Sequence, residues 1–500
     1  MRKNDITRYT AVTLGLVPLI YWSITYLSVD LWYDEVYSFH YFALKGISDT
    51  LFHYPASNNH VLFNFMNHIL SRVLGLRSMD AVMDHVYVFR GVQLLITIAT
   101  AYYSLRIIRK FFYREYSYLN TIVLFTCIPF MNFSLQLRGY NMSSLFSLMV
   151  IYYSWTYVET RGRTGRIMII LSAFLLLYTI PSNLYFLAAF GITIFYAWLV
   201  KLRNPYIVAL SSRRVLIFLL GGVLIAGIAY LPILGDIMSS KLATRAPASV
   251  FHSIAVFTEV IPAFLSDRYL LLFLLIPGLI LMFKREDRLV TKRCLSLLLL
   301  LIFPFVISFV HQKAPFQRVF VVLSPLFCIL LTIIMISVIG RISNGRLRSA
   351  VIIGVSVYCL LTFFYEIRQN NETMTRNFIE KNTIEQNISN NYYLSDFYHP
   401  GESAGHFSSI CDPNLAVAVF DQVDMASSDA YLRKSKINFV WLDSVSELRD
   451  FIGRGNRRKF YIVTSHKNRT SQYLQEEYNL LTRALTSEPS LVNFIECEKP

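Results

Sequence analysis

The sequence has 500 residues, of which 54% are hydrophobic and only 16% are charged. Its mean hydropathy is +0.44, and it contains repeated apolar runs that are each long enough to cross a bilayer. The formal net charge of +15 would suit a nucleic-acid partner, but basic residues in short loops between spans report membrane topology instead. The composition excludes an ordinary soluble protein, and it predicts a polytopic membrane protein with no nucleic-acid partner.

About eleven transmembrane helices are expected, each formed by a run of roughly twenty mostly apolar residues. The first run has a basic start and a long apolar part without an evident small-residue cleavage site, so we interpret it as a retained signal-anchor. The expected spans are 9–29, 86–105, 117–136, 140–158, 166–181, 183–200, 214–234, 268–283, 293–310, 318–340 and 348–366.

Basic residues divide unevenly between the two sets of connections. The N-terminus is dense in Lys and Arg, and so are the loops near 106–114, 161–166, 201–214, 284–293 and 341–348. The longer connections between these loops carry few basic residues. Because cytoplasmic loops are enriched in Lys and Arg, we expect the N-terminus in the cytoplasm and the tail outside, in a bacterial inner membrane.

The stretch LSVDLWYDEVYSFHYF places carboxylates directly after the first span, where the chain is expected to enter the outer compartment. Asp34 is either a solvated loop residue or a general base, since a partly dry aromatic site can raise the pKa of a carboxyl toward the working range. Glu35 can orient the acceptor, tune Asp34 by like-charge repulsion, or bind a metal. These roles remain open at this point.

Cationic and histidine side chains gather in three other segments that are expected to face outward. Arg138 lies at membrane depth in LQLRGYNM, where an ionisable residue is a functional candidate unless it snorkels to the interface. Lys313 and Arg318 in HQKAPFQR suit either a lipid-linked phosphate or anionic headgroups. His53 and His60 bracket the turn in HYPASNNH, where they can contact phosphate or ligate a metal.

Two further segments depart from the spanning pattern. Residues 59–84 are apolar at helical spacing but interrupted by polar side chains, which favours an amphipathic helix in the membrane interface. The tail, 367–500, is polar and predicts a small α/β domain. Strands are expected at 415–420, 437–442 and 459–464, with helices near 444–452 and 471–485. Cys411 and Cys497 form either a disulfide or two free thiols.

These motifs resemble those of the GT-C superfamily of membrane glycosyltransferases, most closely the branch with protein O-mannosyltransferases and bacterial lipid A aminoarabinose transferases. WYDEVYSF is similar to that branch's acidic motif in the first outer loop. HYPASNNHVLFNFMNHIL is similar to its His/Pro segment and interfacial helix, and LRGYNMSSLFSLM to its arginine–tyrosine motif. QRVFVVLSPLF is similar to its late arginine-containing span. The resemblance covers about residues 9–340.

The resemblance implies an α-helical GT-C-like catalytic domain over 1–366, with a first outer loop, 30–85, that contains interfacial helices. The α/β domain expected from the pattern of the tail, 367–500, would follow it on the extracytoplasmic side. It implies transfer of a hexose or pentose from a polyprenyl-phosphate donor to a glycan, lipid or protein acceptor at the outer face. Asp34 matches the base, with Glu35 beside it, and Arg138 and Arg318 match positions that face the donor phosphate. The remaining candidates for donor binding are Tyr140, Lys313, His53 and His60. Participation of a divalent metal ion stays open.

A transporter or flippase for a lipid-linked sugar is the alternative function. It would be expected to carry charges at mid-bilayer on several helices, usually with internal repeats. The expected spans carry few interior charges and no clear repeat. A membrane scaffold that displays the tail would not need the carboxylates and cations collected on the outer side, so the sequence favours the transferase.

Overall fold

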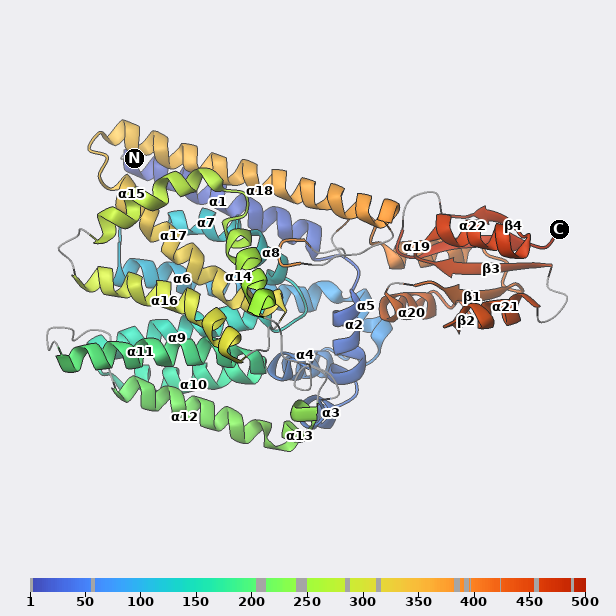
Figure 1. Ribbon diagram of the computed structural model, residues 1–500, viewed down its shortest axis with the longest axis horizontal. Helices are drawn as coiled ribbons and strands as arrows, with labels where there is room; N and C mark the ends of the chain where they lie inside the picture. The colour runs from blue at the N-terminus through green and yellow to red at the C-terminus, as the bar shows by residue number, and fades with distance from the viewer. Residues whose placement is uncertain are drawn as a thin grey trace.

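The computed structural model describes residues 3–54, 59–203, 213–239, 250–283, 288–311, 316–381, 387–390, 395, 397–422, 424–453, 458–486 and 490–500. A bundle of helices lies along the long axis of the molecule, and a small sheet domain lies beyond one end of the bundle (Figure 1). The longer helices are α1 (Lys3–Tyr26), α6 (Val86–Phe111), α9 (Tyr140–Thr160), α10 (Arg163–Thr179), α11 (Leu184–Arg203), α12 (Arg213–Tyr230), α14 (Val250–Leu265), α15 (Leu272–Phe283), α16 (Arg288–His311), α17 (Ser324–Ile339) and α18 (Gly345–Lys381).

Short helices connect and cap the bundle, and several of them gather at the end that faces the sheet domain (Figure 1). The short α-helices are α2 (Tyr33–Ser38), α3 (Ile47–Phe52), α4 (Val61–Val73), α5 (Met79–Asp84), α7 (Leu119–Phe125), α8 (Ile128–Ser134) and α13 (Leu234–Ser239). The π-helix is η1 (Phe39–Ala43), and the 3₁₀-helices are η2 (Pro181–Asn183), η3 (Leu231–Ile233), η4 (Tyr269–Leu271) and η5 (Gln317–Leu323).

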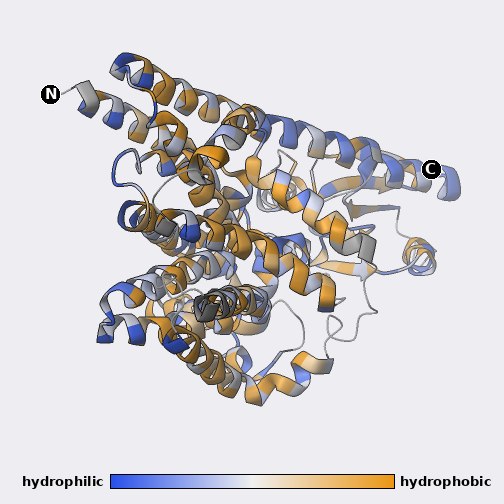
Figure 2. Ribbon diagram, turned by 60° about the vertical axis from the view of Figure 1, so that its left-hand side comes forward, coloured by the Kyte–Doolittle hydropathy of each residue, from blue (hydrophilic) through white to orange (hydrophobic). Residues whose placement is uncertain are grey.

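Five of the described helices are long and apolar enough to cross a membrane: Val86–Phe111, Arg213–Ser239, Val290–His311, Gln317–Ile339 and Gly345–Glu380. A sixth is added if Ile254–Leu265 and Tyr269–Leu281, which meet at a 91° bend, form one broken span. The expected spans 9–29, 117–136, 140–158, 166–181 and 183–200 are not among these helices, so the count of about eleven stays a prediction. Figure 2 shows apolar residues along most of the bundle, whereas the far half of α18 is mainly hydrophilic.

The expected span 117–136 is not one continuous helix, because it breaks between α7 and α8. Pro129 lies in the first turn of α8, where its missing N–H costs nothing. The buried Arg268 guanidinium donates to the carbonyl of Val123 at 2.7 Å and to the hydroxyl of Thr126 at 2.9 Å. It therefore satisfies a carbonyl that the end of α7 leaves without a partner in its own helix.

Two connections that the sequence suggested are also more structured than expected. The segment 235–268, assigned to an outer connection, contains α14, which packs against α8 and α16. The interfacial segment 59–84 divides into α4 and α5. Polar side chains of α4, including Asn64, Asn67 and His68, are buried rather than facing outward. These three side chains therefore point into the protein, whereas Arg72 and Arg77, which also interrupt the apolar pattern, are exposed.

The tail folds as the expected small α/β domain, with five strands in the order β2-β1-β3-β5-β4. Strands β1, β2 and β3 are parallel, and β5 runs antiparallel to both β3 and β4. The strands are β1 (Ala416–Phe420), β2 (Phe439–Leu442), β3 (Lys459–Thr464), β4 (Leu481–Ala484) and β5 (Asn493–Glu498). The helices are α19 (Pro400–Ile410), α20 (Met425–Lys434), α21 (Val445–Gly453) and α22 (Lys467–Tyr478).

The helix expected over 471–485 was half wrong. Helix α22 ends at Tyr478, and Asn479 adopts the left-handed conformation, with φ of 50°, that commonly follows a helix. The residues Leu481–Ala484 then form β4 at the edge of the sheet. Cys411 and Cys497 are both free thiols, which answers the question that their spacing left open.

Each face of the sheet is covered by helices. Period-two alternation sends Val417 and Val419 to the face that packs on α19 and α20, whereas Ala418 faces α21 and α22. The first of these apolar clusters continues into the helical bundle, where it includes Leu31, Val36 and residues of α4 to α6. The sheet domain and the adjoining end of the bundle therefore share one hydrophobic core.

Candidate functional site

Helix α2 carries the two carboxylates into the protein. Asp34 and Glu35 lie in its first turn, where helix N-termini favour negative charge. The backbone N–H of Trp32, just before the helix, donates to Glu35 Oε2 at 3.3 Å. Both carboxylates are buried, Asp34 with 4% and Glu35 with 0% of its surface exposed. Asp34 is therefore inside the protein, and the alternative that it is a solvated loop residue does not describe it in this structure.

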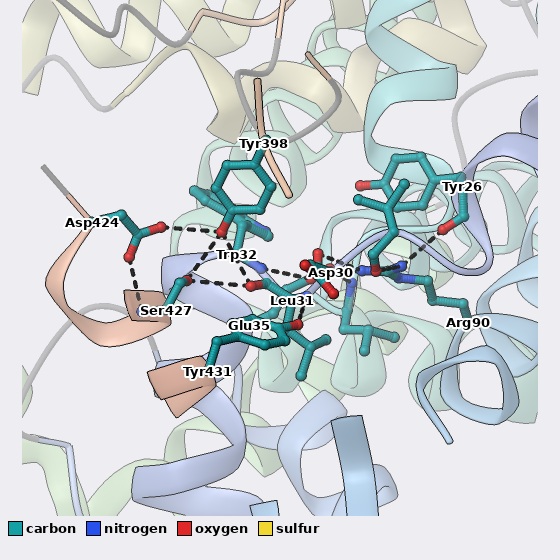
Figure 3. Close-up of polar contacts among 12 residues, drawn as sticks. Tyr26, Asp30, Leu31, Trp32, Glu35, Arg90, Tyr398, Asp424, Ser427 and Tyr431 are labelled. Atoms are coloured by element: carbon teal, nitrogen blue, oxygen red, sulfur yellow. Dashed lines mark hydrogen bonds and ion pairs between the residues drawn. The ribbon is translucent and has the colours of Figure 1, made fainter. Parts of the chain in front are cut away.

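The Glu35 carboxylate is occupied by structural partners. Its Oε2 pairs with the buried Arg90 of α6 at 3.0 Å, and its Oε1 accepts the backbone N–H of Leu137 at 2.7 Å. Arg90 also donates to the backbone carbonyls of Tyr26 and Val29 near the end of α1 (Figure 3). Glu35 therefore joins three segments that are distant in sequence: the α1–α2 connection, α6 and the loop before α9.

Arg138 contacts α2 from inside the protein and lies close to Asp34. Its Nη1 donates to the hydroxyl of Ser38 at 2.6 Å and to the backbone carbonyl of Asp34 at 3.2 Å. Its Nη2 lies 4.0 Å from Asp34 Oδ2. The Arg138 side chain is 1% exposed, so the snorkelling alternative does not describe it in this structure.

The loop that carries Arg138 is fixed at three successive residues. The N–H of Leu137 is bound by Glu35, and the carbonyl of Arg138 accepts from Gln93 Nε2 at 3.1 Å. The N–H of Gly139 donates to His60 Nδ1 at 2.8 Å. A guanidinium whose own backbone is held in this way keeps its place without a bound anion, which is the preorganisation that an electrostatic site needs.

His60 is held as a neutral imidazole. Because a backbone N–H can only donate, Nδ1 must accept from Gly139, and the ring proton is then on Nε2. Burial lowers the pKa of His60 well below its usual range, and the nearby charges of Arg138 and Arg318 lower it further. Nε2 lies 3.2 Å from Arg138 Nη2, so with the ring proton on Nε2 two donors face each other across this short distance. The ring of Tyr140 packs edge-on against His60, with centroids 5.0 Å apart.

Arg318 approaches Asp34 from the partly exposed side of the cluster. Its Nη1 lies 2.9 Å from Asp34 Oδ2, and its guanidinium lies over the ring of Phe316 at 5.2 Å. Its side chain is 25% exposed, so Arg318 can move where Arg138 cannot. With Glu35 paired to Arg90, Asp34 shares its surroundings with two guanidinium groups, and this described cluster carries a net positive charge.

The structure brings Asp34, Arg138, Arg318, His60 and Tyr140 together, whereas Glu35 lies behind them. His53 lies at the end of α3 with an exposed side chain. Lys313 falls outside the described residues, and so does the turn at 55–58. Across the described ranges no cluster of three or more His, Cys, Asp or Glu side chains could hold a metal ion.

Sequence reasoning missed Arg90 and Gln93, which support the site from α6. A signal was present, because Arg90, Gln93 and Thr97 recur at spacings of three and four in an otherwise apolar segment. That spacing places them on one helix face, and buried polar groups at membrane depth need partners. All three are fully buried, and all three hold backbone carbonyls of other segments.

No family model matches the chain, and no curated protein matches it in sequence. Solved structures do match. The ArnT of Cupriavidus metallidurans bound to undecaprenyl phosphate superposes with a TM-score of 0.51 and 11% identity, covering 97% of each chain. The same enzyme in the apo state gives a TM-score of 0.50, again with 11% identity and 97% of each chain covered. The chain has the GT-C fold.

The GT-C fold agrees with the resemblance drawn from the motifs, and it extends over the sheet domain as well as the helical bundle. At 11% identity the likeness establishes the architecture alone. What the cluster around Asp34 does must therefore be argued from its own geometry.

Proposed function

We propose that this protein is a membrane glycosyltransferase that takes a sugar from a polyprenyl-phosphate donor and transfers it to an acceptor at the outer face. Asp34 would be the general base. The observation that carries the proposal is one buried carboxylate between two guanidinium groups, Arg138 fixed on its inner side and Arg318 partly exposed on its outer side. The GT-C fold, which ArnT bound to undecaprenyl phosphate shares, supports it.

The charge balance suits a lipid-linked phosphate. A phosphodiester that links a sugar to a polyprenol carries one negative charge, which would neutralise the excess positive charge around Asp34. Arg138 Nη2 and His60 Nε2–H are donors 3.2 Å apart, and one phosphate oxygen can accept from both. Guanidinium groups and phosphate form charge-assisted hydrogen bonds, which are about twice as strong as neutral ones.

Arg318 would change partner when the donor binds. In the structure it pairs with Asp34 at 2.9 Å, so the guanidinium occupies the carboxylate oxygen that would take the proton of the acceptor. A phosphate beside Arg318 would compete for the guanidinium. Movement of Arg318 to the phosphate would release the Asp34 carboxylate, so that the base becomes active once the donor is in place.

The reaction then follows from these positions. The acceptor hydroxyl or amine gives its proton to Asp34 and attacks the anomeric carbon, forming the new glycosidic bond. The bond between that carbon and the phosphate oxygen breaks, and polyprenyl phosphate leaves with the electron pair. Arg138 and Arg318 stabilise the charge that develops on the leaving phosphate. Attack opposite to the leaving group inverts the anomeric centre.

The proposal is tested with purified full-length protein in lipid vesicles, a panel of radiolabelled polyprenyl-phosphate sugars, and a membrane extract as the source of acceptor. Wild type should release polyprenyl phosphate from one donor. Arg318→Gln should raise the KM for that donor at least about tenfold, because it loses a charge-assisted contact. Arg341→Gln, an exposed arginine just beyond the opposite end of α17, is the matched control and should leave the KM unchanged.

Two results would count against the proposal. If wild type consumes no donor in the panel but moves labelled lipid between leaflets, the protein is a flippase. If Arg318→Gln binds and turns over the donor as wild type does, Arg318 does not contact the phosphate.

A further inference from the structure

The sheet domain forms hydrogen bonds with the backbone of Leu31, in the segment that leads into α2 (Figure 3). The backbone N–H of Leu31 donates to the hydroxyl of Tyr431 at 2.7 Å. The carbonyl of Leu31 lies 3.1 Å from the hydroxyl of Tyr398 and 3.2 Å from that of Ser427. Both backbone groups of one residue in the bundle are thus bound by side chains of the sheet domain.

The hydroxyls that make these contacts are themselves fixed. Asp424 caps α20, because its Oδ1 accepts the backbone N–H of Ser427 at 3.0 Å. Asp424 Oδ2 lies 3.2 Å from the Tyr398 hydroxyl, which lies 3.1 Å from the Ser427 hydroxyl. Each hydroxyl has one proton, so the two share the Asp424 carboxylate and the Leu31 carbonyl between them. All of these side chains are buried.

Asp30 adds a second contact one residue earlier. Its Oδ2 accepts the backbone N–H of Gly401, at the start of α19, at 2.7 Å. A Cβ on Gly401 would lie 2.9 Å from the same oxygen, so the close approach needs a glycine at this position. The carbonyl of Asp30 faces Arg90 Nη2 at 3.4 Å from the opposite side. Residues 30 and 31 are therefore held between the sheet domain and the Arg90–Glu35 pair.

The hydrophobic core continues the same connection. Leu31, Val36 and Phe39 belong to one buried cluster with Phe407 and Tyr431 of the sheet domain. Helix α2 also packs directly against α20. In Figure 1, α2 lies between the bundle and the sheet domain, next to α20. Helix α2, which carries Asp34, thus packs directly against the domain that the sequence analysis placed outside the catalytic domain.

We propose that Tyr398, Ser427 and Tyr431 are positioning residues for Asp34, and that the sheet domain is part of the catalytic unit rather than an appended module. The inference rests on the proposed function of Asp34. Leu31 is three residues before Asp34, and Trp32, between them, is bound to Glu35. A shift of the peptide at Leu31 is therefore passed directly to the first turn of α2. Misplacing a reacting group by about 1 Å can reduce the rate a hundredfold.

The test uses the full-length protein in lipid vesicles and three variants. Tyr431→Phe removes the acceptor of the Leu31 N–H, and Ser427→Ala, the milder change, removes one of the hydroxyls at the Leu31 carbonyl. Tyr461→Phe is the matched control, since this buried tyrosine of the same domain accepts from the N–H of Asp412 within the domain, at 3.2 Å. Amide hydrogen exchange by mass spectrometry and the steady-state kinetics of donor consumption are measured for each.

The inference predicts exchange in the peptide that covers residues 32–38 roughly ten times faster in Tyr431→Phe, and a smaller increase in Ser427→Ala. Peptides from β3 and α17 should exchange as in wild type. The kcat should fall about ten- to a hundredfold, while the donor KM stays within about twofold, because the donor phosphate is held by other residues. Tyr461→Phe should change neither quantity.

Unchanged amide exchange over residues 32–38 in both Tyr431→Phe and Ser427→Ala would overturn the inference. An increase spread evenly over the chain would also overturn it, because it would indicate general destabilisation. A rise in the donor KM with unchanged kcat would also contradict it. If wild type consumes no donor, the proposed transferase function fails. The exchange measurement still decides whether the sheet domain orders α2.

Discussion

Two adjacent carboxylates have opposite surroundings. Glu35 is bound by Arg90 and by two backbone N–H groups. Its carboxylate therefore has a structural role, because it links separate segments of the chain. Asp34 meets Arg318 at the partly exposed edge of the cluster, where a partner can be exchanged. Neighbouring acids whose environments differ in this way are the usual basis for dividing roles within an active site. Sequence alone could not separate them, because the distinction depends on Arg90, which is 55 residues from Glu35.

His60 gives a pH prediction at the same scale. Because its pKa in the folded protein is lowered by burial and by the two arginines, the unfolded chain binds a proton below about pH 6.5 that the folded protein does not. The free energy of unfolding that this group contributes is complete above pH 6.5 and decreases as the pH falls below that value. Thermal unfolding in detergent should therefore show a lower apparent Tm at pH 5 than at pH 7.

The matched variant is His60→Asn, whose side-chain oxygen can still accept from the Gly139 N–H but which does not titrate. The fall in apparent Tm between pH 7 and pH 5 should be smaller in this variant. An equal fall in both proteins would mean that His60 is not held neutral by the fold.

At the scale of elements, the loop between α8 and α9 depends on close packing at Gly139. A Cβ there would lie 2.6 Å from Thr179 Cγ2 and 3.2 Å from His60 Nδ1. Gly139→Ala should therefore displace His60 and Arg138 and lower kcat/KM for the donor at least about tenfold, with the protein still folded. Thr179→Ser removes the clashing methyl group but keeps the hydroxyl that donates to the Leu175 carbonyl.

The double variant Gly139→Ala with Thr179→Ser should recover part of the lost kcat/KM. Recovery is incomplete because the contact with His60 remains. If the double variant is as impaired as Gly139→Ala, the contact with Thr179 is not what Gly139 avoids.

The elements also show what the sequence could and could not predict. Apolar runs located most helices, and charged residues in those runs or at their ends made Asp34, Arg138 and Arg318 candidates, which the structure brings close together. The pattern missed β4, because the helical spacing of apolar residues continues through Leu481–Ala484, although Asn479 has already ended the helix. It also missed the break before α8, which is stabilised by Arg268, 145 residues away from Val123. Local pattern does not encode such distant partners.

At the scale of the whole molecule, the sheet domain and Asp34 must lie on the same side of the membrane, because Asp30 and Leu31 are bound directly to the domain. Cys411 is the one partly exposed cysteine, and the other five are buried. A membrane-impermeant maleimide should therefore label Cys411 in right-side-out vesicles, and Cys411→Ser should abolish the labelling. Labelling confined to inside-out vesicles would place the site in the cytoplasm and contradict the orientation predicted from the basic loops.

The most direct test of the central claim is donor turnover by Asp34→Asn, measured as polyprenyl phosphate released in vesicles. Asp80→Asn, an exposed carboxylate of the same connection between α1 and α6, is the control. Asp34→Asn keeps the side-chain shape, so it should fold and bind donor but lose at least about a hundredfold in kcat, because general-base catalysis contributes that much or more. Asp80→Asn should match wild type. Equal turnover by Asp34→Asn and wild type would show that this buried carboxylate is not the base.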